Sequence, residues 1–172
     1  MGAKEIQKSI KKYAMSYAEL QGWQEKLEMI PIGDQKTGCI GEFYAYLYLV
    51  KIFPNSKISF AGHSEKGWDI EIRSNILTER IQVKTVSAYS TTRVISPIHY
   101  GWNQLFIIYL DKSFKPLGFW IIKDVSIVKE SGVLKSRKCR KPDNLNSGSK
   151  DIPFGQNRVK ELIVAIDSAT SA

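Results

Sequence analysis

Three ionisable residues interrupt stretches of this sequence that are otherwise apolar. Glu42 lies in GCIGEF (38–43), Asp69 in GWDIEI (67–72) and Lys84 in IQVKT (81–85). Burying a carboxylate costs several kcal/mol unless it is paired with a cation or binds a metal. These positions are therefore the first candidates for chemistry. Each also has a purely structural alternative. Glu42 could be a helix residue paired with a lysine, Asp69 a cap at the start of a strand, and Lys84 a strand lysine whose ammonium reaches solvent.

The spacing of polar residues in the two β-like segments predicts a shared polar face. Side chains alternate along a strand, so Asp69 shares a face with Glu71, and Gln82 shares a face with Lys84. Isoleucine and valine fill the other face of both segments. If the segments form a hairpin, the polar groups meet on one side of the sheet. Glu71 is either an exposed strand carboxylate or a second ligand.

Such a cluster is suited to hydrolysing phosphodiesters. Carboxylate, amide and main-chain carbonyl oxygens are hard ligands that suit Mg²⁺, for which Mn²⁺ can substitute. A bound metal polarises the phosphodiester and lowers the pKa of its water, while a nearby lysine stabilises negative charge on the reacting phosphate.

Hydrophobic periodicity predicts the elements that position these residues. A helical segment is expected over 4–30, with a break at Gly22, and a core helix over 39–53. Strands are expected over 57–62, 68–74, 80–88, 103–111 and 117–124, and a final helix over 157–167. The order favours an α/β sandwich around a mixed central sheet of about five strands flanked by helices. We expect a single domain, with an N-terminal helical segment (1–36), a core (37–125), and a basic loop with the last helix (126–172).

Asp69, followed on the next strand by Gln82-Val83-Lys84, resembles the PD-(D/E)XK signature of restriction-endonuclease-like nucleases, with Gln at the D/E position. Glu42, in a helix ahead of three strands, resembles the upstream acidic residue of many members. The resemblance covers about residues 37–125 and implies the order α-β-β-β-(α)-β. It implies that Asp69 is the principal metal ligand, that Gln82 fills the second ligand position and that Lys84 is the catalytic lysine. Glu42 becomes an auxiliary ligand or a water-positioning group.

The sequence departs from the family pattern at two places. Gly67-Trp68 stands where a proline often precedes the aspartate, and Gln82 replaces a carboxylate, which removes one negative charge from the implied metal site.

The charge balance points to an anionic partner. Lys and Arg number 25 against 17 Asp and Glu, a net charge of +8, and nucleic acid is the commonest partner of such an excess. The segment directly after the third strand and a later basic cluster are the candidates for DNA contacts, although a solvated loop would also account for the cluster. These residues are Ser90, Thr91, Thr92 and Arg93, and Lys135, Arg137, Lys138, Arg140 and Lys141.

Composition indicates the cellular compartment and argues against a membrane span. The two cysteines do not make a disulfide framework, so a cytoplasmic protein with reduced thiols is expected, with Cys39 in the core. The longest apolar run, residues 43–50, is too short for a membrane span. His63 and His99 are interpreted as loop residues, with phosphate or DNA contacts as the minority alternative.

The residues and the resemblance together favour a Mg²⁺-dependent DNA endonuclease, of a type II restriction-like or defence kind, acting as a homodimer. Two duplex strands suit two active sites related by a two-fold axis. The alternatives are a structure-selective repair or Holliday-junction-resolving nuclease, and a non-catalytic DNA-binding module on the same fold.

Overall fold

The computed structural model describes residues 2–24, 26, 37–62, 67–123, 133–134 and 155–171. Its helices are α1 (Ala3–Gln24), α2 (Thr37–Ile52) and α3 (Val159–Thr170). Its strands are β1 (Lys57–Phe60), β2 (Ile70–Arg73), β3 (Thr78–Ser87), β4 (Ile98–His99), β5 (Gln104–Leu110), β6 (Pro116–Ile122) and β7 (Val133–Leu134).

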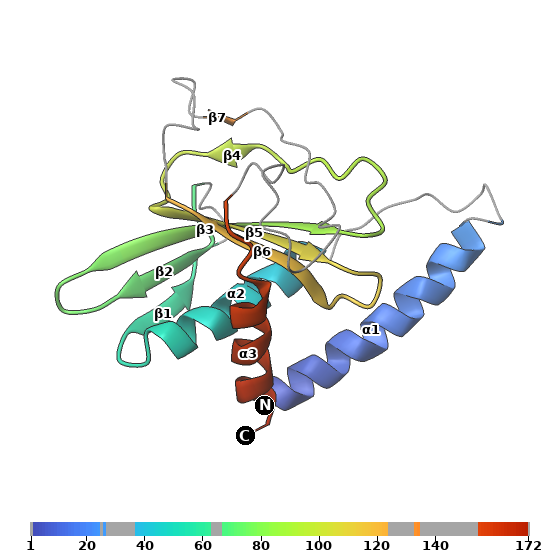
Figure 1. Cartoon of the computed structure of the whole chain (residues 1–172), viewed down its shortest axis with the longest axis horizontal. Helices are drawn as coiled ribbons and strands as arrows, with labels where there is room; N and C mark the ends of the chain where they lie inside the picture. Colours follow the sequence, from blue (N-terminus) through green and yellow to red (C-terminus); the bar gives the residue numbers. More distant parts are fainter. Residues whose placement is uncertain are drawn as a thin grey trace.

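Five strands form one mixed sheet in the order β1-β2-β3-β5-β6 (Figure 1). Neighbours are antiparallel except β3 and β5, which run parallel from Ile81↔Gln104 to Ser87↔Leu110. A parallel pair needs a crossover, and residues 88–103 provide it. This crossover is irregular and contains β4, which pairs with β7 in a separate two-stranded sheet. The prediction of an α/β fold around a mixed sheet of about five strands flanked by helices is confirmed.

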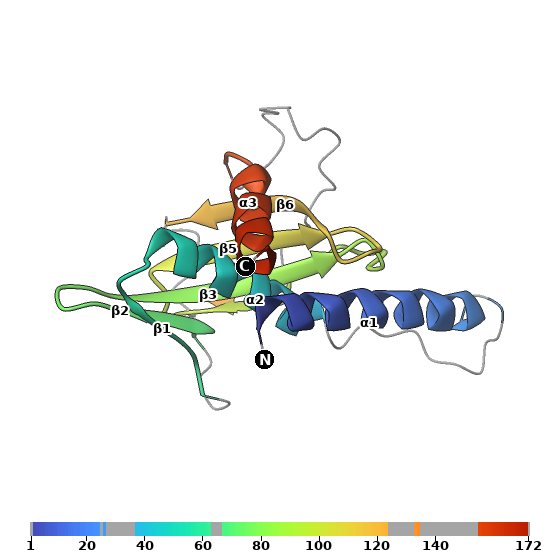
Figure 2. The ribbon, with the colours of Figure 1, turned by 90° about the horizontal axis from the view of Figure 1, so that it is seen from below.

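The two faces of the sheet are covered differently. The helices lie on one face (Figures 1 and 2), where the larger core joins α1, α2 and α3 to alternate residues of the strands, such as Ile70, Ile81 and Val83. The crossover covers the other face, where Ile95, Ile98 and Trp102 join the buried strand residues. Strand β5, buried along its whole length, was expected from its continuous apolar run.

Helix α2 approaches β3 closely at Gly41. A Cβ atom at this position would lie 1.8 Å from Thr85 Oγ1 and 2.8 Å from Thr85 Cβ. Real Cβ atoms do not approach neighbours this closely, so only glycine lets the helix lie at this depth. Glu42, the next residue of α2, is brought to the edge of β3 by this contact.

Aromatic rings join α1 to two turns at the end of the sheet. Tyr17 of α1 lies 4.6 Å from Tyr89 and 5.8 Å from Phe114, measured between ring centroids. Phe114 is fully buried, and the hydroxyl of Tyr44 in α2 donates a hydrogen bond of 3.0 Å to its carbonyl oxygen. These contacts hold the turn after β3 and the turn between β5 and β6 against the helices.

Two predictions about the helices are wrong. The expected break at Gly22 is absent, because one glycine in a helix costs only about 1 kcal/mol relative to alanine and α1 continues to Gln24. Cys39 is exposed, because it lies on the side of α2 that turns away from the core. Within the described residues, no helix is both long and apolar enough to cross a membrane.

Two glycine substitutions in helices are expected to have opposite effects on stability. Gly41→Ala places a methyl group inside the Thr85 side chain, and overpacking of this kind costs about 1–3 kcal/mol. Gly22→Ala meets no atom within 4 Å and should stabilise the fold by about 0.5–1 kcal/mol. Thermal unfolding of the two variants beside the wild type measures both effects. An unchanged or raised Tm for Gly41→Ala would contradict the close contact.

Candidate active site

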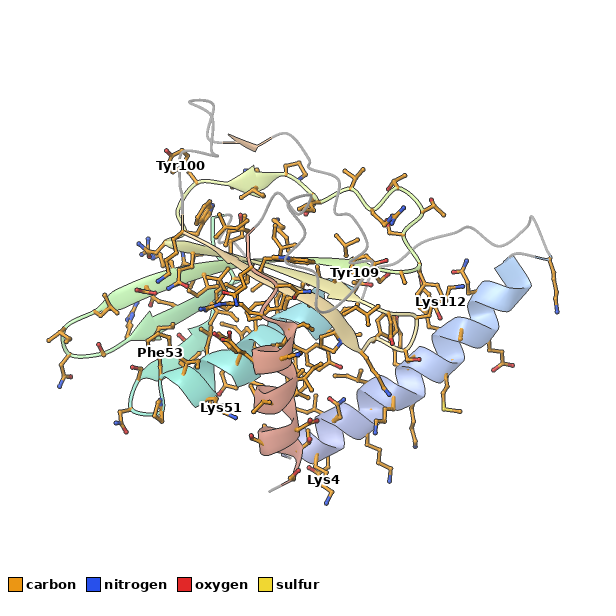
Figure 3. The ribbon with its side chains drawn as sticks, viewed as in Figure 1. Lys4, Lys51, Phe53, Tyr100, Tyr109 and Lys112 are labelled. Atoms are coloured by element: carbon orange, nitrogen blue, oxygen red, sulfur yellow. The ribbon has the colours of Figure 1, made fainter. Side chains whose placement is uncertain are left out.

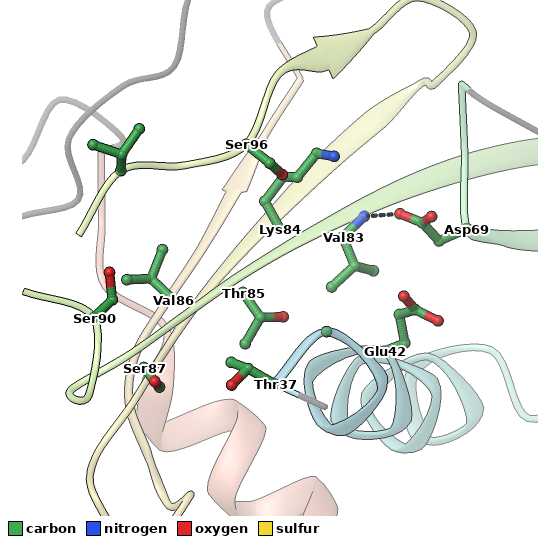
Figure 4. A pocket seen from close by; sticks show the side chains of 12 residues that line it. Thr37, Glu42, Asp69, Val83, Lys84, Thr85, Val86, Ser87, Ser90 and Ser96 are labelled. Carbon is green, nitrogen blue, oxygen red and sulfur yellow. Dashed lines mark hydrogen bonds between the residues drawn. The ribbon is translucent and has the colours of Figure 1, made fainter. Parts of the chain in front are cut away.

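A cavity of about 380 Å³ opens beside the second half of β3 (Figure 4). It brings together side chains from α2, from Asp69 directly before β2, from β3 and from the crossover. The lining residues are Thr37, Gly38, Glu42, Asp69, Val83, Lys84, Thr85, Val86, Ser87, Ser90, Val94 and Ser96.

The cavity exists because β2 is shorter than β3. Pairing between these strands runs from Arg73↔Thr78 to Ile70↔Ile81, so β3 has no β2 neighbour beyond Ile81. At this edge the Val83 N–H of β3 donates a hydrogen bond of 2.6 Å to Asp69 Oδ2 (Figure 4). The predicted hairpin is confirmed, and its open end fixes the Asp69 carboxylate.

Glu42 and Lys84 reach this edge from opposite faces of the sheet. Val83 packs in the core on the α2 face, so Lys84 leaves β3 on the other face. Figure 4 shows the Glu42 carboxylate on α2 and the Asp69 carboxylate beside the same stretch of β3. The three groups that interrupt the apolar pattern of the sequence therefore line one cavity.

Burial and mutual charge shift the pKa of all three groups. Burial, helped by the negative charge of Asp69, raises the pKa of Glu42 from 4.5 to about 7. Burial also raises the pKa of Asp69, although the Val83 hydrogen bond and Lys84 oppose the shift. Burial lowers the pKa of Lys84, although both carboxylates oppose that shift. Clustered groups with perturbed pKa values in a cleft are typical of active sites.

Gln82 is not brought into this cavity. Its side chain is buried on β3 but is absent from the lining, and its Oε1 has no hydrogen-bond partner among the residues that the structure describes. A buried amide oxygen without a partner is costly. The role of Gln82 as a metal ligand stays a prediction.

Glu71 is neither exposed nor in the cavity. Its carboxylate is buried and pairs with Arg73 and with Arg80, whose Nε lies 3.3 Å from Glu71 Oε2. The Arg80 guanidinium also lies 5.2 Å from the centroid of the Trp68 ring. Because Trp68 precedes Asp69, this network braces the chain at the point where the Asp69 carboxylate is presented. The alternation of charges on neighbouring strands could have indicated the pair.

The other candidate residues divide into three groups. Ser90 lines the cavity, Thr91 and Arg93 line an adjoining groove, and Thr92 is exposed and lines neither. His99 is half-buried in β4. His63 and the five basic residues, Lys135, Arg137, Lys138, Arg140 and Lys141, lie outside the described residues. Sequence analysis missed the hydroxyl groups of Thr37, Ser87 and Ser96, which the fold alone brings to the cavity.

The donor atoms of the cavity fit a divalent cation. Asp69 and Glu42 supply hard carboxylate oxygens, and the charge of a bound cation would counter the burial and the Asp69 repulsion that raise the pKa of Glu42. The described residues hold no group of three or more histidine, cysteine, aspartate or glutamate side chains that could bind a metal. Mg²⁺ commonly takes only one or two protein carboxylates and completes its shell with water and substrate oxygens.

No protein-family model and no curated protein matches this chain. Among solved structures, a bacterial homing endonuclease aligns with 81% of this chain and 96% of its own length, at 13% identity and a TM-score of 0.42. What the cavity does is therefore inferred from the residues of this chain alone.

The raised pKa of Glu42 makes stability depend on pH in a defined direction. A carboxyl whose folded pKa is about 7 rather than 4.5 contributes stability that is full below pH 4.5 and is lost as the pH rises through 7. Glu42→Gln should therefore raise the Tm at pH 8 and change it little at pH 4.5. Thermal unfolding with EDTA at both pH values tests this, with Glu19→Gln on the exposed face of α1 as the control. An equal effect of Glu42→Gln at both pH values would contradict the shift.

Proposed function

We propose that this protein is a metal-dependent DNA endonuclease whose active site is the cavity at the open edge of β3. The observation that carries the proposal is the convergence of Glu42, Asp69 and Lys84 from three separate elements on that cavity. Two carboxylates and a lysine are the side chains that phosphodiester hydrolysis with a divalent cation needs. They are also residues of the PD-(D/E)XK-like pattern in the sequence.

Asp69 and Glu42 are the residues that would hold the cation. When bound, Mg²⁺ would polarise the phosphodiester and make its water more acidic. The Val83 N–H holds Asp69 Oδ2 in place, so this carboxylate keeps its orientation before any ligand arrives. Preorganised groups of this kind need little rearrangement during the reaction.

Lys84 and Glu42 supply the charge and the proton acceptor. The Lys84 ammonium is partly buried, so its positive charge is weakly screened where negative charge develops on the phosphate. Glu42 has two alternative roles. It either holds the cation together with Asp69, or it stays off the cation, where a pKa of about 7 suits it to position the attacking water and accept its proton near neutral pH.

The net charge of +8 supports a nucleic-acid substrate, because DNA affinity is dominated by phosphate contacts. Within this class we propose a restriction-like or defence nuclease that acts as a homodimer on duplex DNA. A structure-selective nuclease is distinguished by its substrate: it would cut synthetic junctions and leave linear duplexes intact. Incubation with plasmid, junctions and RNA in Mg²⁺ or Mn²⁺ separates these activities.

One observation favours a second candidate, a DNA-binding module without catalysis. The position that is a carboxylate in the family pattern is Gln82, and this side chain does not line the cavity. Such a protein would shift DNA in a gel with or without metal and leave it uncut.

Removing the Asp69 carboxylate should stop cleavage, and removing the Lys84 ammonium should slow it strongly, without unfolding the protein. Asp69→Asn removes a carboxylate that would hold the metal, and plasmid cleavage should be lost. Lys84→Ala removes one stabiliser of developing charge, which typically lowers the rate about 10²- to 10³-fold. Plasmid cleavage with Mg²⁺, and with EDTA as the blank, measures both effects. The exposed residues Asp167 and Lys57 provide the matched controls Asp167→Asn and Lys57→Ala. Cleavage at the wild-type rate by either site variant would exclude this cavity.

Gln82→Glu tests the second ligand position. If residue 82 reaches the metal, the added carboxylate should strengthen Mn²⁺ binding, as measured by calorimetric titration. If Gln82 only packs in the sheet, the new charge is buried without a partner. The fold should then lose about 1–3 kcal/mol, with no gain in metal affinity.

A further inference from the structure

A second groove adjoins the candidate active site. It has a volume of about 550 Å³ and shares Ser90 with the first cavity. Its walls are the turn that follows β3 and the turn between β5 and β6. The polar side chains along it are those of Ser90, Thr91, Arg93, Asp111, Lys112 and Ser113. We call it the Arg93–Lys112 groove.

Arg93 has an unusual backbone that fixes it in this groove. Its φ of 50° lies in the left-handed region, which is uncommon for residues other than glycine. Its N–H donates a hydrogen bond of 3.0 Å to Ser90 Oγ, so the turn is closed by the residue that the two cavities share. In the described part of the chain, no carboxylate lies within 4.0 Å of its guanidinium. The turn fixes the Arg93 backbone, and the guanidinium is left without a carboxylate partner among the described residues.

Lys112 is fixed on the opposite wall through Tyr89. Its Nζ lies 5.8 Å from the centroid of the Tyr89 ring, and the Tyr89 hydroxyl donates a hydrogen bond of 3.1 Å to the Lys112 carbonyl oxygen. Tyr89 in turn packs against Tyr17 of α1. Figure 3 shows Lys112 at the turn that faces α1. The exposed Lys112 is thus positioned by Tyr89, one of the aromatic residues that join α1 to the sheet.

The one acidic residue that lines the groove, Asp111, is hydrogen-bonded to the main chain of its own turn. Asp111 Oδ1 accepts hydrogen bonds from the N–H groups of Ser113 and Lys115, at 2.7 and 2.8 Å. This carboxylate oxygen shapes the turn that carries Lys112. Two cations against one carboxylate leave the groove positive, and the hydroxyls of Ser90, Thr91 and Ser113 add neutral donors. Cations with hydroxyls are the groups that contact phosphate and sugar, whereas reading bases requires groups that match base edges.

We propose that the Arg93–Lys112 groove binds the phosphodiester backbone of DNA next to the phosphate that is cut. This inference rests on the proposed nuclease function, because the groove meets the candidate active site at Ser90. Arg93 and Lys112 would each contact a phosphate, and the hydroxyls would contact phosphate or sugar oxygens. The groove would position the strand without selecting its sequence.

The test measures DNA binding in EDTA, so that no cleavage is needed. Fluorescence anisotropy with short labelled duplexes of several sequences gives Kd at a series of salt concentrations. Arg93→Ala and Lys112→Ala should each weaken binding about tenfold, the size expected for losing a hydrogen bond to a charged group. Each should also lower the salt slope of log K by about 0.9. The loss should be the same for all sequences.

Lys115→Ala is the matched control. Lys115 is exposed in the same turn but does not line the groove, and the N–H that bonds Asp111 stays in the variant. Its affinity and salt slope should equal those of the wild type.

Three results would overturn the proposal: wild-type affinity and salt slope in both Arg93→Ala and Lys112→Ala, an equal loss in Lys115→Ala, or a loss seen with RNA and not with DNA. These outcomes are independent of the proposed catalysis. If the wild type cuts DNA but the double variant Arg93→Ala, Lys112→Ala keeps the wild-type affinity and salt slope, the groove proposal fails and the nuclease proposal stands. If the wild type does not cut DNA but the variants lose affinity for it, the nuclease proposal fails, and the groove remains a binding site for the DNA backbone.

Discussion

The close contact between α2 and β3 at Gly41 and Thr85 is the constraint on which the arrangement of the site depends. Any side chain larger than hydrogen at residue 41 would overlap Thr85. The depth at which the helix lies decides where Glu42 stands relative to Asp69. A helix held further out by even one methyl group would withdraw one carboxylate from the pair, and the mutual charge effect on the pKa of Glu42 would weaken with distance.

The arrangement of the site also requires the edge of β3 that β2 leaves uncovered. This edge explains why ionisable groups are tolerated there. Where β2 ends, the Val83 N–H of β3 bonds a side chain, that of Asp69, in place of a strand neighbour. The same edge lets Lys84 approach from the face opposite to Glu42. Shifting three pKa values away from their ordinary ranges costs stability, because burial disfavours the charged forms. Proteins keep such costs where function requires them, and the large cores on both faces of the sheet offset them here.

Most elements could be predicted because their signals are local. Alternating isoleucine and valine predicted β2 and β3, and the continuous apolar run of 105–110 predicted a strand covered on both faces. The errors arose where local preference is weak. Gly22 permits a helix as well as a break, and the exposure of Cys39 depends on which side of α2 meets the sheet. Glu71 was left with two alternatives, because Arg80 becomes its neighbour only through the register of β2 with β3, although Arg73 lies two residues away on the same strand.

The sequence by itself determined the residue types of the site, since Glu42, Asp69 and Lys84 each interrupt an otherwise apolar pattern. It also determined the hairpin that brings Asp69 to β3. Tertiary structure alone decided that Glu42 joins them, that Gln82 stays out of the cavity and that Ser90 links the cavity to a basic groove. The physical reason is distance along the chain. Alternation and helical periodicity fix neighbours a few residues apart, whereas α2, β3 and the crossover meet only through the packing of the core.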